Sequence, residues 1–182
     1  MDQAILRATI QLLSEVGYVR VSVAEVARRA GVSKPAIYRR WSQKSQLVVE
    51  AMVTQMRPGK DKDSGSAADD LVALTEQLID SLTHTPLGRV LPGLVAEMAA
   101  DPVLATSYRD LIIKPNQEHW RAAVERGIAT GELAIDTDAD FVLKSLVGPL
   151  YFCLLITGEP IAAGYARAAV DLILTRYGTA AR

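Results

Sequence analysis

Apolar residues recur along this chain at intervals of three and four positions, which is the spacing of one face of an α-helix. Residues 2–16 show the pattern first, with Ile5, Leu6, Leu12 and Leu13 on one side. No segment alternates polar and apolar residues over the length of a strand and then ends at a hairpin turn. The pattern predicts an all-α protein of about nine helices: residues 2–16, 22–29, a short helix after Ser33, about 43–57, 67–84, 88–99, 101–129, 138–157 and 160–177.

Capping residues mark the ends of the first helices. Ser22 is followed three positions later by Glu25, which is the signature of a capping box. Ser33 is followed by Pro35, and proline is favoured in a first helical turn because its missing N–H costs nothing there. Gly31 stands between these two helices, where a turn with positive φ is expected. The pattern predicts two short, well-delimited helices before residue 43.

A break in composition then divides the chain. Residues 57–66 contain no apolar residue except one proline, so they predict a connection between two helical parts. The part that follows holds the longer helices. Pro92 and Pro115 lie inside its helical patterns, where they should kink or interrupt the helix.

Composition favours a soluble cytoplasmic protein. Hydrophobic residues make up 49% of the chain and charged residues 23%, which is ordinary for a globular domain. The one cysteine, Cys153, cannot form an internal disulfide, which excludes a disulfide-stapled secreted fold. Asp2 stands where a signal peptide would be basic, and the longest apolar run, residues 146–157, is too short to cross a bilayer. We therefore expect no membrane association.

Charge is distributed unevenly. Residues 1–60 hold ten Lys or Arg and four Asp or Glu, a formal charge of +6, whereas residues 61–182 carry −7. A phosphate backbone attracts the first part and repels the second, so the division points to nucleic acid as a partner of the N-terminal part. A chance division of solvated charge would look the same, and the sequence motifs have to decide between the two.

The stretch from Val21 to Leu47 predicts a helix-turn-helix. Two short helices that meet steeply need a small residue where they cross and a turn residue that tolerates positive φ, and Ala27 and Gly31 stand at those positions. Apolar residues at the matching offsets supply the shared buried face: Val26, Val32 and Ile37.

The second helix of this motif presents a basic face that suits the major groove of DNA. Arg39 is the best candidate for reading a base, because its guanidinium can donate to both O6 and N7 of guanine. Lys34, Tyr38 and Lys44 suit phosphates. The alternative is a merely solvated face, but between positions 20 and 44 seven basic residues stand against one acid, Glu25.

This stretch resembles the TetR family of bacterial transcriptional regulators. The resemblance covers about the first 50 residues, and Trp41 stands where the family usually has Phe. Weaker similarities follow in the second part. The motifs that carry the resemblance are Gly17-Tyr18, Ser22-Val-Ala-Glu-Val-Ala27, Ala30-Gly-Val-Ser-Lys-Pro-Ala-Ile-Tyr38, Trp41-Ser-Gln-Lys44, Gly131-Glu-Leu133, Gly148-Pro-Leu-Tyr151 and Thr157-Gly-Glu-Pro160.

The resemblance implies an all-α homodimer with residues 1–46 as the helix-turn-helix domain and residues 47–182 as the regulatory and dimerisation domain. It implies that Tyr38 and Lys44 contact phosphates, and that Ser22 caps its helix and contacts phosphate. Ala24 cannot supply the base-reading Arg that some members have two positions after that cap, so readout leans on Lys34 and Arg39. The expected DNA-binding set is Ser22, Ser33, Lys34, Pro35, Ala36, Tyr38, Arg39, Arg40 and Lys44.

Dimerisation is also a physical expectation, because one helix-turn-helix reads only a few base pairs and specific sites need two. The last two predicted helices carry leucines and small residues that would allow close helix packing. The same residues could instead close the core of one chain. The expected interface set is Leu146, Leu150, Leu154, Ala162, Ala166, Ala169, Val170 and Ile173.

An effector pocket is expected in the second part of the chain. Methionine-lined apolar pockets adapt to several ligands, and a few polar side chains could orient one. A filled core would use the same residue types. The family implies a small-molecule effector, which the sequence does not identify. The expected pocket set is Met52, Met56, Leu78, Leu94, Met98, Tyr108, Ile112, Asn116, His119 and Trp120.

Other chemistry is poorly supported. His84, His119 and Cys153 lack the spacing of metal ligands, and the acids from Asp136 to Asp140 begin a calcium loop that then lacks its glycine and glutamate. No nucleophile elbow, phosphate loop or dinucleotide fingerprint occurs, so we expect no enzyme, no metal and no cofactor.

The sequence therefore predicts a ligand-responsive regulator. It would be a repressor that binds a palindromic operator as a homodimer and is released by a small apolar or amphipathic effector. The alternatives are a helical enzyme or small-molecule carrier with an incidental basic head, and a DNA-binding regulator without a ligand.

Overall fold

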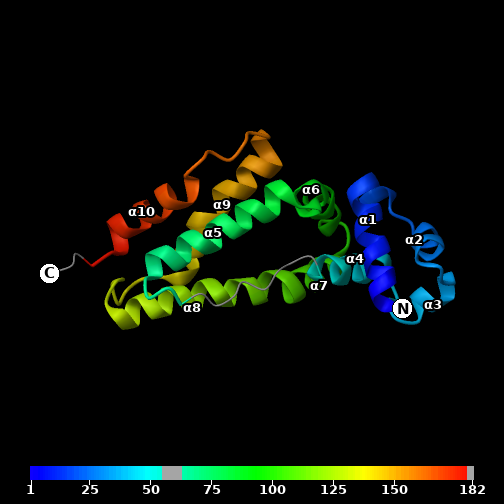
Figure 1. Ribbon diagram of the computed structural model, residues 1–182, viewed down its shortest axis with the longest axis horizontal. Coiled ribbons are helices and arrows are strands. Elements are labelled where there is room, and N and C mark those ends of the chain that lie inside the picture. The colour runs from blue at the N-terminus through cyan, green and yellow to red at the C-terminus, as the bar shows by residue number, and fades with distance from the viewer. Residues whose placement is uncertain (55–62, 180–182) are drawn as a thin grey trace. The chain divides into compact units, whose positions relative to one another are not determined.

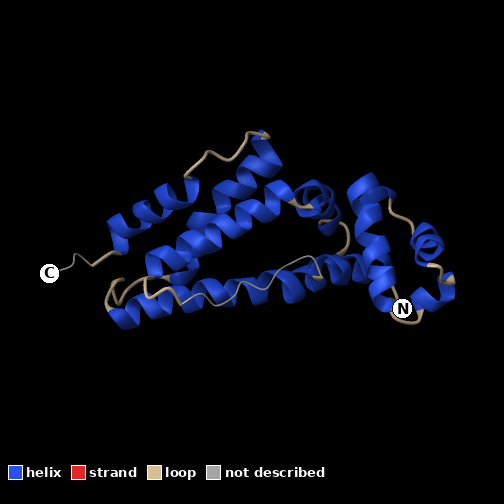
Figure 2. Ribbon diagram, in the orientation of Figure 1, coloured by secondary structure: helices blue, strands red, loops and turns tan. Residues whose placement is uncertain are grey.

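The computed structural model describes residues 1–54 and 63–179, and in these ranges the protein is helical with no strand (Figures 1 and 2). A π-turn, η1 (Arg109–Ile113), joins α7 and α8, and a second, η2 (Cys153–Thr157), extends α9. Counted as continuous rods, the described residues form nine helices, which confirms the predicted fold class. The α-helices are α1 (Asp2–Arg20), α2 (Val23–Ala30), α3 (Lys34–Tyr38), α4 (Lys44–Val53), α5 (Ala67–His84), α6 (Pro86–Met98), α7 (Pro102–Tyr108), α8 (Lys114–Thr130), α9 (Ala139–Phe152) and α10 (Tyr165–Tyr177).

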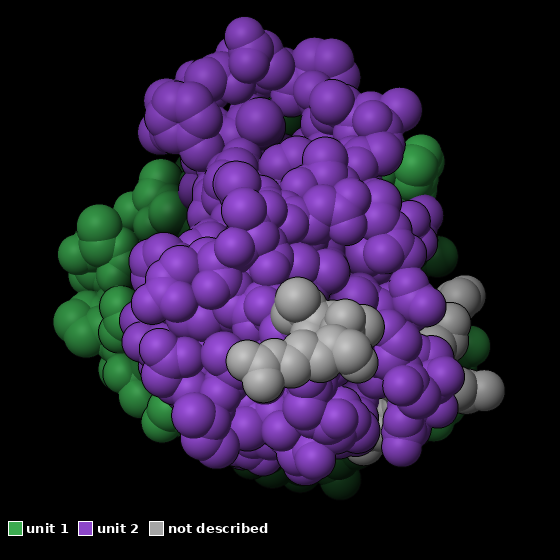
Figure 3. Space-filling view, turned by 90° about the vertical axis from the view of Figure 1, so that its left-hand side faces the viewer, with its two compact units in different colours: residues 1–57, 81–114 green, residues 58–80, 115–182 purple. Residues whose placement is uncertain are grey.

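The chain forms two compact units, which Figure 3 distinguishes by colour. Unit 1 contains residues 1–57 and 81–114, and unit 2 contains residues 58–80 and 115–182. The unit that carries α1–α3 therefore also holds α4, α6 and α7. The boundary that the sequence places between residues 46 and 47 is a functional one and stays a prediction.

Unit 1 is built around α1, which packs against α2, α4 and α6. The apolar face predicted for the first helix is buried there, with Ile5 and Leu13 no more than 1% exposed. Gly88 allows α6 to lie directly on the end of α5, because a Cβ at this position would stand 1.7 Å from the carbonyl oxygen of Leu82. Unit 1, which carries the basic N-terminal part of the chain that we call the head, thus has a core of its own. This core fixes the position of α2 and α3.

Unit 2 is a four-helix core made by α5, α8, α9 and α10. Gly127 on α8 is required by close packing, since a Cβ there would lie 2.6 Å from the Cβ of Ala67 and 2.8 Å from Leu133. The buried apolar residues of this core are Ala67, Ala68, Leu71, Val72, Trp120, Ala123, Val124, Leu133, Val142, Leu143, Leu146, Ala166, Val170, Ile173 and Tyr177.

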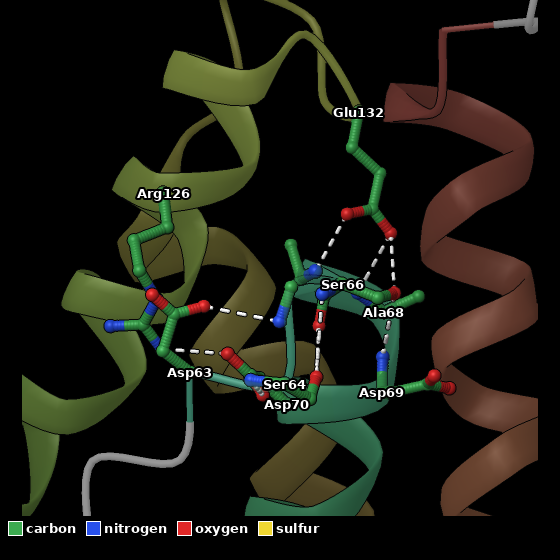
Figure 4. A network of polar contacts seen from close by, with 10 residues as sticks. Asp63, Ser64, Ser66, Ala68, Asp69, Asp70, Arg126 and Glu132 are labelled. Carbon is green, nitrogen blue, oxygen red and sulfur yellow. Dashed lines mark hydrogen bonds and ion pairs between the residues drawn. The ribbon is translucent and has the colours of Figure 1, made fainter.

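A carboxylate from another element caps the start of α5 (Figure 4). Glu132, in the turn after α8, accepts hydrogen bonds from the backbone N–H groups of Ala67 at 2.6 Å and Ala68 at 3.0 Å. The buried carboxylate of Asp70 pairs with Arg126 of α8 at 2.8 Å. Since a helix N-terminus leaves N–H groups without intrahelical partners, Glu132 satisfies donors that would otherwise be lost. The residues that follow the connection are thereby held on unit 2.

The bounds of the first and sixth helices differ from the prediction. The first helix continues past Gly17, which adopts φ 73° as a kink, and ends at Arg20. α6 begins at Pro86, two residues early, because the hydroxyl of Thr85 accepts from the N–H of Leu87 and caps it. The predicted end of the fourth helix at residue 57 lies outside the described residues.

The last helix begins later than predicted, so one residue of the expected interface set, Ala162, is not helical. The pattern places its start at residue 160, whereas α10 begins at Tyr165. Proline at position 160 disfavours a helical residue before it, and Gly164 adopts φ 78° in the left-handed region. Ala162 therefore lies in the connection between η2 and α10, exposed, and not on a helix face.

Prolines inside the long helices do not break them. α6 runs through Pro92 and α9 through Pro149. Pro115 follows the π-turn η1, in which the N–H of Lys114 donates to the carbonyl of Arg109. A wider turn at this point accommodates a residue that lacks an N–H donor, so the rod from α7 to α8 stays continuous.

The apolar helix near the C-terminus forms where the pattern predicts it, over residues 138–157. α9 and η2 together form one helical stretch, Ala139–Thr157, of 19 residues. By length and composition alone this stretch could cross a membrane, although its longest uninterrupted apolar run has only twelve residues. Only 22% of an 18-residue part of this stretch is buried, which leaves a large apolar surface on this helix to be accounted for.

Candidate nucleic-acid interface

The helix-turn-helix forms as its capping residues predict. The Ser22 hydroxyl accepts a hydrogen bond from the N–H of Glu25 at 3.2 Å, and the Ser33 hydroxyl accepts one from the N–H of Ala36 at 3.3 Å. Gly31 ends α2 in the left-handed conformation, with φ 66° and ψ 32°. The turn therefore depends on a conformation that other residues adopt only at a cost.

The shared face of the two helices is buried as expected. Ala27 is 5% exposed and Ile37 is 1% exposed, while Val32 is half-buried. Trp41 is buried after α3, and its indole N–H donates to the carboxylate of Glu50 on α4 at 2.7 Å. This bond ties the segment that follows α3 to α4.

The opposite face of α3 is open to solvent. Lys34, Pro35, Arg39 and Arg40 are exposed, Tyr38 is 44% exposed, and only Ala36 is half-buried. The caps of the two helices, Ser22 and Ser33, are also exposed. Of the nine residues expected to bind DNA, the structure thus exposes seven and leaves two, Ala36 and Lys44, half-buried.

Lys44 lies half-buried at the start of α4. Its ammonium donates to the backbone carbonyl of Tyr18 at 3.2 Å and lies 4.3 Å from the centroid of the Tyr18 ring. Burial raises the pKa of Tyr18 to about 12, with a further contribution from the negative charges of Asp101 and Glu97. Lys44 therefore joins the end of α1 to the start of α4.

Part of the positive charge of the head is already paired. Arg28 and Arg29 both donate to Glu25, and Arg29 also donates to both carboxylate oxygens of Glu15 at 2.7 Å. These hydrogen bonds from Arg28 and Arg29 lower the pKa of Glu25 to about 2. Arg40 pairs with Asp2.

The charge count over positions 20–44 of the sequence left out two of these acidic partners. Glu15 and Asp2 lie outside the stretch from position 20 to position 44, and only the fold carries them to the motif. On α3 itself, Lys34 lies 5.7 Å from the ring of Tyr38, and Arg39 forms no ion pair within the described residues. Lys34 and Arg39 are the most available cations of this face.

The residues expected to form an effector pocket are divided between the two units. Met52, Leu94, Tyr108 and Ile112 are buried in unit 1, and Met98 is half-buried there. In unit 2, Trp120 belongs to the core, while Leu78, Asn116 and His119 are half-buried. Met56 lies outside the described residues.

A small cavity does occur in unit 1, and of the expected pocket residues only Met52 lines it. Its volume is about 20 Å³, room for about one water molecule. The lining comes from α1, α4, the end of α5 and α6: Ile10, Leu13, Met52, Ser81, Thr85, Pro86, Leu87 and Val90.

Most residues expected at a dimer interface face the core of their own chain. Leu146 and Val170 have no exposed surface, and Leu150, Ala166 and Ile173 are at most 6% exposed. They leave almost nothing for a partner to contact. Leu154 and Ala169 are half-buried, so of the expected set only these and the exposed Ala162 retain accessible surface.

Large apolar side chains on the same two helices are exposed instead. Phe141 is 53% exposed, Phe152 55%, Ile156 71% and Leu172 71%. Three of them lie on α9 and η2, and Leu172 lies on α10. Sequence periodicity could not tell which of the two apolar faces of these helices looks outward.

Metal chemistry finds no support in the described ranges, where no group of three or more His, Cys, Asp or Glu side chains could hold a metal ion. Cys153 is a half-buried free thiol.

Comparison with known proteins identifies the family of both parts. A profile described as "Bacterial regulatory proteins, tetR family" matches residues 5–51, and one described as "Tetracyclin repressor-like, C-terminal domain" matches residues 61–173. The HTH-type transcriptional regulator YdeS of Bacillus subtilis is 33% identical over 178 residues, which are 96% of this chain and 87% of that protein. The DNA-binding transcriptional repressor TetR of Mycobacteroides abscessus is 29% identical over 180 residues, covering 96% and 94%.

Solved structures show the same fold. The TetR family transcription regulator SCO0332 has a TM-score of 0.78 and 28% identity, covering 95% of this chain and 96% of that one. FadR of Bacillus subtilis in complex with stearoyl-CoA has a TM-score of 0.75 at 15% identity, covering 96% and 98%. The relatives named here are transcriptional regulators and not enzymes. With the family's helix-turn-helix at its N-terminus and the family's C-terminal domain after it, this chain belongs to the TetR family of DNA-binding transcriptional regulators.

Proposed function

We propose that this protein is a homodimeric repressor that binds a palindromic operator through α3 and is released by a small apolar or amphipathic effector. The observation that carries the proposal is the open face of α3, where Lys34 and Arg39 stand exposed beyond a turn fixed by Gly31. It would act in the cytoplasm, where chromosomal DNA is accessible.

The roles on this face follow from side-chain chemistry. Arg39 is the C-cap of α3 and has a planar guanidinium with no ion-pair partner among the described residues, so we assign it to base readout. Lys34, Tyr38 and Arg40 are assigned to phosphates, together with the exposed hydroxyl edges of Ser22 and Ser33. Pro35 and Ala36 are assigned to apolar contacts in the groove, because both are small.

A homodimer would cover the exposed apolar face of α9. Phe141, Phe152 and Ile156 lie outward on α9–η2, whereas Leu146 and Leu150 of the same helix are buried. Gly148 is exposed on the outward side, and a Cβ there would meet nothing within 4 Å, which leaves room for the backbone of a second helix. A second copy that places its own apolar face here would remove both surfaces from water.

Two copies are also what the DNA requires. A single α3 has five residues and reads a few base pairs, whereas two copies on one face of the duplex read half-sites about 34 Å apart. The interface proposed here is therefore the outward set Phe141, Gly148, Phe152, Ile156 and Leu172, with Leu154, Ala162 and Ala169 of the original expectation beside it.

An apolar effector is supported by the composition of the helices and by one structural relative. FadR is known in complex with stearoyl-CoA, a ligand with a long alkyl chain, and its fold matches this chain. α4 packs against α1, α7 and η1 within unit 1, so a ligand that displaces α7 would shift α4 and with it the head. A coupling of about 1–3 kcal/mol would weaken operator binding roughly 5–150-fold.

A regulator without a ligand is the second candidate. The cavity in unit 1 holds about one water molecule, so it admits no effector without rearrangement. Calorimetry with an acyl-CoA distinguishes a regulator that binds such an effector from one that does not. Burial of the alkyl chain in the protein would give a negative heat capacity change on binding.

Selection from a pool of random duplexes tests the proposal. We expect the wild-type protein to enrich a palindrome whose arms are centred about 10 base pairs, or a multiple of that, apart. Enrichment of a single, non-repeated half-site would contradict the homodimer on DNA. Absence of any enriched or salt-sensitive duplex would contradict operator binding itself.

A further inference from the structure

An ion pair joins the start of α1 to the end of α3. Arg40 Nη1 contacts the Asp2 Oδ2 atom, Asp2 lying in the first turn of α1 and Arg40 two residues after Tyr38 ends α3. The side chains of Arg40 and Asp2 are 51% and 36% exposed. The pair is therefore open to a ligand that approaches from solvent.

The other arginine pairs of the head differ from this one. Arg28 and Arg29 lie on α2 and share Glu25, and Arg29 also binds Glu15 with both terminal nitrogens. They form a connected network that fixes α2 on α1. Arg40 has one acidic partner in the described part of the chain, and it stands at the edge of the face assigned to DNA.

The second oxygen of the Asp2 carboxylate has a different environment from the first. Its Oδ1 atom is buried and has no hydrogen-bond partner among the described residues. A buried carboxylate oxygen without a partner is costly, and the other oxygen of this carboxylate contacts the guanidinium of Arg40. The Asp2 carboxylate thus relies on Arg40 as its ion-pair partner. Arg40, in contrast, could pair with a DNA phosphate, which is negatively charged like the carboxylate.

We propose that Asp2 restrains DNA binding by holding Arg40, as a built-in competitor of the phosphate backbone. This inference rests on the proposed function, because it requires that the edge of α3 meets DNA. When DNA binds, Arg40 leaves the Asp2 carboxylate and pairs with a phosphate. The binding free energy gained from the Arg40–phosphate contact is reduced by the free energy of the lost Arg40–Asp2 pair. The negative charge of Asp2 near the incoming phosphate lowers the gain further.

The sign of the expected effect is unusual and therefore diagnostic. Asp2→Asn removes the competitor but keeps the size of the side chain, so DNA binding becomes tighter. Damage to the fold would only weaken binding. Exposed ion pairs are worth up to about 1 kcal/mol, which corresponds to a gain of about two- to fivefold for each head.

Fluorescence anisotropy with two duplexes of about 30 base pairs tests the inference, one selected by the wild type and one of scrambled sequence. Four proteins are compared over a range of salt: wild type, Asp2→Asn, Arg40→Ala and the double variant. We expect Asp2→Asn to bind both duplexes more tightly, with a salt slope steeper by up to about 0.9 per head. In the Arg40→Ala background, Asp2→Asn should give no gain.

Two results would overturn the inference. One is a wild type that binds DNA while Asp2→Asn binds no more tightly. The other is a gain that persists in the Arg40→Ala background, which would mean that Asp2 acts on DNA by repulsion alone. Glu125→Gln, an exposed acid on α8, controls for the change in net charge and should leave affinity unchanged. If the wild type binds no duplex at all, the proposed function fails and this inference fails with it.

Discussion

The ammonium of Lys44 lies 4.3 Å from the centroid of the Tyr18 ring and donates to the Tyr18 carbonyl at 3.2 Å. An ammonium has three donors, and Tyr18 takes one of them, so Lys44 retains donors for a phosphate while its position is fixed by α1. This arrangement combines a structural contact with a binding contact in one side chain.

Lys44→Met separates these two contributions, because methionine keeps much of the apolar stem. We expect weaker binding to all DNA sequences alike and a salt slope lower by about 1 per head. Lys114→Met, on an exposed lysine of unit 1 outside the motif, serves as the control. A lower melting temperature with an unchanged salt slope would show that Lys44 only holds the end of α1.

Arg39→Ala tests base readout. The guanidinium is exposed at the end of α3, so its removal should leave the fold intact and cost about 1–3 kcal/mol at the base pair that it reads. Competition with operators substituted one base pair at a time measures this, and preference should relax at one position in each half-site. Arg89→Ala, exposed on α6, should change nothing. If the base preference of Arg39→Ala were unchanged at every position, we would assign base readout to Lys34 instead.

Gly31→Ala tests the turn of the motif. A Cβ at this position would meet nothing within 4 Å, so the cost comes from the left-handed backbone alone and should be about 1–2 kcal/mol. Gly93→Ala on α6 is the matched control, since it also has open space but no positive φ, and it should stabilise by about 0.5–1 kcal/mol. Thermal unfolding measures both, and equal shifts in the two variants would contradict the argument.

The ion pair of Asp70 with Arg126 makes stability depend on pH. Burial alone would raise the pKa of Asp70, but hydrogen bonds from Arg126 and Ser64 outweigh it and lower the pKa below its ordinary value. The stabilising contribution is therefore fully present above the ordinary value of about 4 and is lost as pH falls through the lowered one. Near neutral pH, Asp70→Asn should lower the free energy of unfolding measured in urea. In acid, the free energies of unfolding of the variant and the wild type should come closer together. A constant difference across that range would contradict this assignment.

The proposed interface predicts that charge on the outward face of the last helices separates two copies. Phe152→Glu and Leu172→Glu place a carboxylate where the partner would exclude water, so a micromolar sample should become monomeric. Leu111→Glu, at a side chain that is 52% exposed in unit 1, should leave the assembly unchanged. Sedimentation velocity measures the mass, and a dimer that survives both substitutions would place the interface elsewhere.

The sequence by itself determined which segments are helical and where the DNA-binding motif lies, because caps, glycines and helical periodicity act within a few residues. Ser22, Ser33 and Gly31 perform in the structure the local tasks that their residue types predict. The tertiary structure alone decided which side chains meet across the chain. It paired Arg40 with Asp2, placed Leu146 and Val170 in the core, and left Phe152 and Leu172 exposed. Periodicity shows that a helix has an apolar face, but burial depends on the neighbours that only folding brings to it.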